Sequence, residues 1–137
     1  RQAVSPSGHR QRWSVWTIYP RGLFDTIREI ETGGHPDPSN AVGQHNELGP
    51  YQITEEYWVD AITHKPGIGG TYDDVRNQYY AEWIMMAYWD RHAPDWKPET
   101  LARVHNGGPN GHYLKSTDKY WEKFKRIKGD TDANSGV

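Results

Sequence analysis

Residues 30–53, IETGGHPDPSNAVGQHNELGPYQI, form a long polar loop that follows a helical pattern and closes with a compact Gly-Pro-Tyr-Gln turn. Before this loop, Leu23, Ile27 and Ile30 recur at helical spacing, which predicts a first helix of about ten residues. The glycines and the proline that follow are expected to end that helix. Glu31 therefore lies on its last turn, at the entrance to the loop.

The position of Glu31 favours a carboxyl group that keeps its proton. The C-terminal end of a helix carries a partial negative charge, which disfavours a carboxylate. Apolar neighbours such as Ile27 and Ile30 are expected to desolvate the group, and both effects raise its pKa. A carboxylic acid that stays protonated near neutral pH can act as a general acid, which is the chemistry that glycosidases use. The alternative interpretation is an ordinary surface glutamate near a helix end.

The composition fits a single domain whose core is rich in aromatic side chains. The 137 residues include 7 Trp, 9 Tyr and 2 Phe but no Cys. The mean hydropathy is -1.00 and aliphatic residues are sparse, so indole and phenol rings must supply much of the core. The absence of cysteine excludes disulfides and thiolate metal sites, so we expect packing to provide the stability.

The charge balance gives no support for a polyanionic partner. The 16 basic and 18 acidic residues give a net charge of -2, which offers no argument for nucleic acid or an anionic membrane. No run of residues is apolar enough to span a bilayer, and the first residues, RQAVSPSGHR, lack an apolar segment of the signal-peptide type. The 7 histidines are scattered without ligand spacing, so we expect neither a metal site nor a cofactor.

Four further helices are predicted from periodicity and from residues that can cap a first turn. Prolines 94 and 98 are expected to break the chain between the third and fourth helices of the domain. The helices are residues 55–62 after Thr54, a long buried helix from Thr71 to about His92, residues 101–106 after Thr100, and a helix from Ser116 or Thr117 to a C-cap at Gly129.

These elements predict a mostly α fold, or an α+β fold with little β. About five helices would pack beside a small lobe of loop or hairpin around residues 39–53, with a cleft between the two parts. We expect the domain to cover residues 22–129. An N-terminal arm over residues 1–21 would pack one or two tryptophans on the domain, and residues 130–137 would form a flexible tail.

Several strings resemble, in the same order, the invertebrate-type or destabilase-like lysozymes. They are IETGG, AVG, GPYQIT with YWVDA, ARVHNGGPNG and STDKYW, within residues 23–127. A looser form of the pattern resembles the soluble lytic transglycosylase domains. Both families belong to the lysozyme-like superfamily and cut peptidoglycan glycan strands. The resemblance therefore implies a lysozyme-like fold and a monomeric enzyme that acts on peptidoglycan, either secreted or periplasmic.

The resemblance also implies roles for residues on both sides of the cleft. Glu31 matches the general acid, and the GPYQ turn matches one wall, which makes Tyr51 and Gln52 candidate substrate-binding residues. The amide of Gln52 could instead satisfy backbone groups of the loop.

The string HNGG matches the segment that faces the scissile sugar from the other lobe. His105, Asn106 and Gly107 are therefore further candidates for substrate binding, although the Asn106 amide could also satisfy loop backbone. Tyr120 and Trp121 match family aromatics that could belong to the core or to the site.

This chain departs from the family pattern in two respects. The resemblance implies a second carboxylate, an aspartate, just before the Val-Gly step, and Ala41 occupies that place. The family's cysteines are also missing. The corresponding positions hold Gly34, Leu48, Ala61 and His112.

Three mechanisms are compatible with a missing aspartate. Glu47, or failing that Asp37, could supply the second carboxylate from the loop. Alternatively, Glu31 could act alone as acid and then base, as in lytic transglycosylases, where the substrate N-acetyl group is the nucleophile and an anhydro-muramyl end is formed. The third possibility is a catalytically weak module that binds peptidoglycan- or chitin-type glycans through Trp and Tyr faces.

Overall fold

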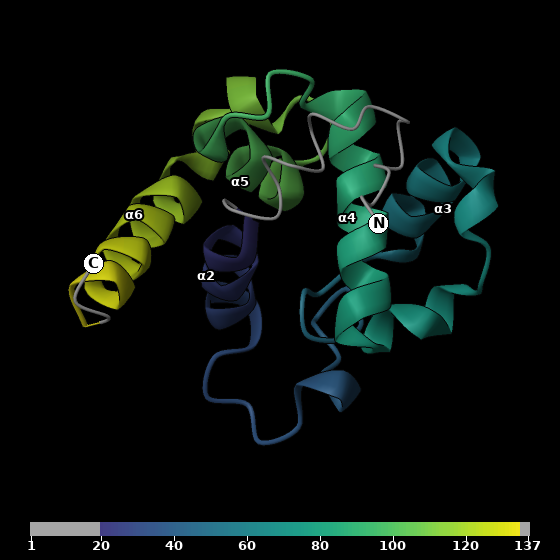
Figure 1. The fold of residues 1–137 in the computed structure, drawn as a ribbon, viewed down its shortest axis with the longest axis horizontal. Helices are drawn as coiled ribbons and strands as arrows, with labels where there is room; N and C mark the ends of the chain where they lie inside the picture. The colour runs from purple at the N-terminus through teal and green to yellow at the C-terminus, as the bar shows by residue number, and fades with distance from the viewer. Residues whose placement is uncertain (1–19, 135–137) are drawn as a thin grey trace, which may run out of the picture.

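The computed structural model describes residues 20–134, which form a bundle of α-helices connected by loops and short 3-10 turns (Figure 1). The predicted arm over residues 1–21 lies almost wholly outside the described residues, as do residues 135–137. The mostly α fold and the number of helices expected from the sequence are confirmed. Within residues 20–134, the five α-helices are α2 (Pro20–Thr32), α3 (Glu55–His64), α4 (Gln78–His92), α5 (Pro98–Gly107) and α6 (Asp118–Asn134).

Short 3-10 turns shape the connections between the helices. The turns are η1 (Pro38–Asn40), η2 (Pro66–Ile68), η3 (Tyr72–Arg76), η4 (Gly111–Tyr113) and η5 (Lys115–Thr117). Within residues 20–134, none of the helices combines the length and the apolar character needed to cross a membrane.

Helix α4 forms the centre of the domain, between α3 on one side and α5 on the other (Figure 1). Its side chains are apolar around most of the helix, as expected for a buried segment. The indole of Trp89 is completely buried; it stacks on Phe24 of α2 with ring centroids 5.7 Å apart. The same indole donates a hydrogen bond of 3.0 Å to the carbonyl of Leu101 in α5. One side chain therefore ties three helices together.

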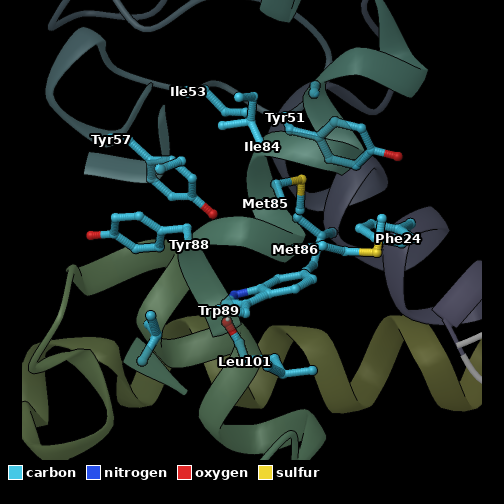
Figure 2. Close-up of a cluster of buried hydrophobic side chains, with 14 of the residues drawn as sticks. Phe24, Tyr51, Ile53, Tyr57, Ile84, Met85, Met86, Tyr88, Trp89 and Leu101 are labelled. Carbon is cyan, nitrogen blue, oxygen red and sulfur yellow. Dashed lines mark hydrogen bonds between the residues drawn. The ribbon is translucent and has the colours of Figure 1, made fainter. Parts of the chain in front are cut away.

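The remaining core confirms the aromatic packing expected from the composition. Figure 2 shows Tyr57 and Tyr88 side by side next to Trp89. Their rings stack with centroids 3.7 Å apart and join α3 to α4. Buried aromatic pairs of this kind supply large apolar areas without disulfides.

The long central helix begins later than its sequence pattern predicted. Thr71 does cap a first turn, together with Asp74 in a capping box, but that turn is η3. The chain then leaves the helical conformation at Asn77, whose φ is -82° and ψ is 127°. The Asn77 side chain accepts hydrogen bonds from the backbone N–H groups of Tyr79 and Tyr80 in the first turn of α4, so this residue is the cap of the long helix.

Two other helix ends also differ from the prediction. Pro98 occupies the first turn of α5 after Lys97, so it begins the helix instead of breaking the chain. Gly129 lies inside α6 and does not end it, because the helix continues to Asn134. The pair of Lys128 with Asp132, one helical turn further on, favours helix past the glycine.

The lobe that follows α2 contains isolated β-bridges instead of extended strands. The predicted small β content is therefore confirmed. Leu48 pairs in antiparallel fashion with both Val42 and Ile53. Gly49 then turns the chain with φ +81°, a conformation that favours glycine. A Cβ on Gly49 would lie 2.5 Å from the carbonyl oxygen of Val75, so the backbones of the lobe and η3 are in close contact there.

We predict that Gly49→Ala destabilises the fold more than Gly34→Ala. Both glycines have positive φ, +81° and +83°, but a Cβ on Gly34 would meet nothing within 4 Å. Gly34→Ala, the control, should lower the free energy of unfolding by about 1 kcal/mol, because only its backbone conformation is unfavourable for alanine. Gly49→Ala should lower it by about 2–4 kcal/mol, because the neighbouring backbone must also move. Urea unfolding of both variants measures the difference, and equal losses would contradict the predicted close contact.

Candidate active site

Three helices meet at the carboxyl group of Glu31. Glu31 lies on the last turn of α2, as predicted, and its side chain is 20% exposed. The hydroxyl of Tyr120, from α6, donates a hydrogen bond of 2.9 Å to Oε2 of Glu31. His105, from α5, places its Nε2 atom 3.7 Å from the same oxygen. The carboxyl is therefore shielded on one side and accessible on the other.

Burial raises the pKa of Glu31 to about 7. The hydrogen bond from Tyr120 opposes this rise, the negative charge of Glu47 adds to it, and Lys123 lowers the pKa slightly. The direction of the shift is the one expected from the sequence. The main cause of the raised pKa is desolvation by burial, which is one of the two effects expected from the sequence.

His105 is held as a neutral imidazole by two hydrogen bonds. Its Nε2 atom lies 3.0 Å from the carbonyl oxygen of Tyr51, which can only accept, so Nε2 carries the hydrogen. Its Nδ1 atom then accepts from the hydroxyl of Tyr57 at 3.0 Å. Burial lowers the pKa of His105 to about 4. The side chain is 2% exposed, which contradicts the predicted direct contact of His105 with substrate.

Tyr51 belongs to the core and not to the wall of a groove. Its side chain is completely buried, and its hydroxyl donates to the carboxylate of Glu82 at 2.5 Å while accepting from Arg28 at 2.8 Å. Glu82 is also paired with Arg21. The predicted substrate contact by the Tyr51 side chain is therefore wrong. Its backbone carbonyl still serves the site, because it orients His105.

The predicted amides have different surroundings. Gln52 donates from Nε2 to the carbonyl oxygens of Gly49, at 3.0 Å, and Ala41, at 3.4 Å, so it satisfies loop backbone, which was the alternative interpretation. Asn106 is exposed on the last turn of α5 and stays a candidate for substrate binding. A Cβ on Gly107 would lie 2.5 Å from the Thr117 side chain, so this glycine permits close packing.

Of the two acids proposed in the loop, Glu47 is the one whose charge acts on Glu31. Glu47 is half-buried, and its negative charge raises the pKa of Glu31. Its Oε1 atom accepts from the backbone N–H of His45 at 2.6 Å. Asp37 is exposed and accepts instead from the Asn40 side chain. Ala41, where the resemblance places an aspartate, is buried with 4% exposure.

A surface pocket lies beside the loop that carries Glu47. It has a volume of about 870 Å³ and is lined by His45 and Asn46 of the loop, the first residues of α3 and Tyr72. Within the described part of the chain, no three His, Asp or Glu side chains are grouped so that they could hold a metal ion.

Sequence reasoning gave no role in this site to Tyr57 and Glu82, and it left Tyr120 open between the core and the site. Tyr120 is separated from Glu31 by 89 positions, so its contact could not be inferred from local spacing. Tyr57 looked like an ordinary helix residue. Glu82 did carry a signal, because an acidic residue on the apolar face of a buried helix requires basic partners, and it finds them in Arg21 and Arg28.

The fold and the geometry of Glu31 define a helical domain with a shielded general acid at a helix end, and comparisons with known proteins specify the family. No family model matches the chain. An invertebrate-type lysozyme of Ruditapes philippinarum is 34% identical over 84 residues, which cover 59% of this chain and 60% of that protein. A lysozyme of Magallana gigas is 35% identical over 107 residues, covering 71% of this chain and 72% of the relative.

Solved structures agree with these sequence relatives. The crystal structure of Tapes japonica lysozyme matches with a TM-score of 0.66 at 26% identity, covering 78% of this chain and 89% of that one. The chain belongs to the invertebrate-type lysozyme family. The predicted family and the lysozyme-like fold are confirmed. The chain spans 60% of the length of the Ruditapes relative.

The raised pKa of Glu31 predicts a component of stability that depends on pH. The folded-state pKa of about 7 exceeds the usual value of 4.5, so this stabilisation is complete below the lower value and is lost as pH rises through the higher one. Wild type should lose about 3 kcal/mol of unfolding free energy relative to Glu31→Gln between about pH 4 and pH 8. Urea unfolding across this range measures the difference, and parallel curves would contradict it.

Proposed function

We propose that this protein cleaves the β-1,4 glycan strand of bacterial peptidoglycan with Glu31 as the general acid. The observation that carries the proposal is a carboxyl group whose pKa burial raises to about 7 while 20% of the side chain stays exposed. Such a group keeps its proton near neutral pH and is accessible to a bridging oxygen. The lysozymes among the relatives support the same class of substrate.

In the proposed reaction, the proton of Glu31 passes to the glycosidic oxygen. The bond from the sugar carbon to that oxygen breaks, and its electron pair goes to the leaving oxygen. A water molecule then adds to the positively charged sugar carbon, and the proton that it loses goes to the carboxylate of Glu31 or of Glu47. Glu47 supports this scheme because its negative charge acts on Glu31 and would stabilise the developing positive charge on the sugar.

A second candidate is a lytic transglycosylase, in which the substrate N-acetyl group replaces the second carboxylate. The buried Ala41 favours it, because no acid stands at the place where the resemblance implies one. Glu47 also has one oxygen bonded to the backbone N–H of His45, which limits its freedom to approach a sugar. The products of the two reactions differ in their ends.

The proposed substrate also indicates where the enzyme acts. Peptidoglycan lies outside the cytoplasm, so we propose that the enzyme acts as a secreted or periplasmic protein. It would act as a monomer without a cofactor, since the proposed chemistry uses side-chain carboxyl groups alone.

The replacement Glu31→Gln should abolish cleavage of purified cell walls. The amide cannot donate a proton of suitable acidity, so the rate should fall by about 100-fold or more. Glu29→Gln is a matched control, because Glu29 is an exposed acid on the same helix. Turbidity clearing measures both variants. Full activity in Glu31→Gln would overturn the assignment, and wall binding by a wild type that cleaves nothing would favour a glycan-binding module.

The pH profile should depend on Glu47 in a defined direction. Wild-type activity should fall as pH rises through about 7, since the ionised Glu31 cannot act as an acid. The negative charge of Glu47 raises the pKa of Glu31, so Glu47→Gln should shift this decline to lower pH. A decline that does not move, or moves to higher pH, would contradict the proposed proximity of the two carboxyl groups.

The ends of the product distinguish the two proposed reactions. Mass spectrometry of digested cell wall should show reducing ends if water completes the reaction. Anhydro-muramyl ends would overturn the hydrolase mechanism and support the transglycosylase.

A further inference from the structure

The two oxygens of Glu31 have different neighbours. Oε2 accepts the hydrogen bond from Tyr120 at 2.9 Å. Burial raises the pKa of the Tyr120 hydroxyl well above its usual value, and the charge of Glu31 adds to the rise. Tyr120 therefore keeps its hydrogen throughout the pH range of the reaction and can serve as a permanent donor.

His105 lies near the same oxygen but directs its hydrogen elsewhere. The Nε2 atom of His105 carries its hydrogen, because its partner at 3.0 Å is the carbonyl oxygen of Tyr51. This Nε2 atom is also 3.7 Å from Oε2 of Glu31. A proton on Oε2 would face the positive end of the Tyr120 O–H dipole, which disfavours that position electrostatically.

We infer that Tyr120 reserves Oε2 of Glu31 as an acceptor and so places the transferable proton on Oε1. This inference rests on the proposed role of Glu31 as the general acid. In it, Tyr120 is a positioning residue, since it touches the acid and not the substrate. The carboxyl group is thereby oriented before a glycan binds.

The same arrangement prepares Glu31 for the second half of the reaction. When the proton leaves Oε1 for the bridging oxygen, Glu31 becomes a carboxylate. The hydrogen bond from Tyr120 then joins a neutral donor to a charged acceptor, and such bonds are roughly twice as strong as neutral ones. Tyr120 therefore stabilises the ionised acid, which is consistent with the lowering effect of this bond on the pKa of Glu31.

Other ionisable groups also face Glu31 and must be held constant in any test. Glu47 of the loop raises the pKa of Glu31, and Lys123 of α6 lowers it. Across the site, the buried hydroxyl of Tyr57 in α3 lies in the electrostatic field of Glu31. A substitution at Tyr120 leaves these groups in place.

Tyr120→Phe provides the test, with Tyr88→Phe as its matched control. Each replacement removes one hydroxyl from an aromatic ring of the core region; Tyr120 is partly buried against the core, and Tyr88 is 4% exposed and stacks on Tyr57. We expect Tyr120→Phe to raise the titration midpoint of the Glu31 carboxyl by about one pH unit, because the ionised form loses a donor. Tyr88→Phe should leave the midpoint unchanged. Carbon-13 NMR of labelled glutamate, assigned with Glu31→Gln, measures the midpoint.

Kinetics supply a second readout. Tyr120→Phe should lower kcat about tenfold with KM unchanged, and should move the alkaline decline of activity to higher pH. If Tyr120→Phe does not fold, site-specific 3-fluorotyrosine at position 120 keeps the ring and makes the hydroxyl a stronger donor. That replacement should lower the midpoint of Glu31.

The inference is overturned if the midpoint of Glu31 does not rise in folded Tyr120→Phe, or if Tyr88→Phe shifts it equally. With the fluorinated residue, an unchanged or raised midpoint would overturn it. The titration uses no substrate, so it separates this inference from the proposed function. If the wild-type protein cannot cleave cell walls, the proposed glycan cleavage is contradicted. The NMR titration would still decide whether Tyr120 controls the proton of Glu31.

Discussion

The shielding of one carboxyl group from water is the constraint on which the rest of the site depends. Glu31 would be an ordinary exposed acid if α2 ended in solvent. Instead α5 and α6 pack beside the end of α2, and Tyr120 and His105 cover one side of the carboxyl. Desolvation raises its pKa to about 7, and the proposed acid catalysis follows from that value.

The core and the site are parts of one network. Trp89 ties α4 to α2 and α5, which fixes the position of His105 on α5. The backbone carbonyl of Tyr51 orients the His105 ring, and the Tyr51 hydroxyl is fixed in turn by Glu82 of α4. In a chain without cysteine, aromatic stacking and this buried polar network provide the rigidity that a precisely placed acid requires.

Local patterns predicted the features that local physics determines. The spacing of Leu23 and Ile27 gave the first helix and put Glu31 on its last turn, and Thr54 caps α3 as expected. Asn77 escaped prediction because the apolar pattern runs through it, although its backbone N–H closes η3 and its side chain caps α4. Tyr51 and His105 were expected to bind substrate and Tyr120 was left open between core and site, because their surroundings depend on contacts between segments distant in sequence, such as the 89 positions between Glu31 and Tyr120. Resemblance to a family supplied the type of chemistry, and the structure distinguished side chains that face the acid from those that support it.

The most direct measurement is the titration of the Glu31 carboxyl in the free wild-type protein, followed by carbon-13 NMR. We predict a midpoint near 7. A midpoint near the ordinary value of 4.5 would contradict the central claim, because Glu31 would then be ionised at neutral pH and would have no proton to give.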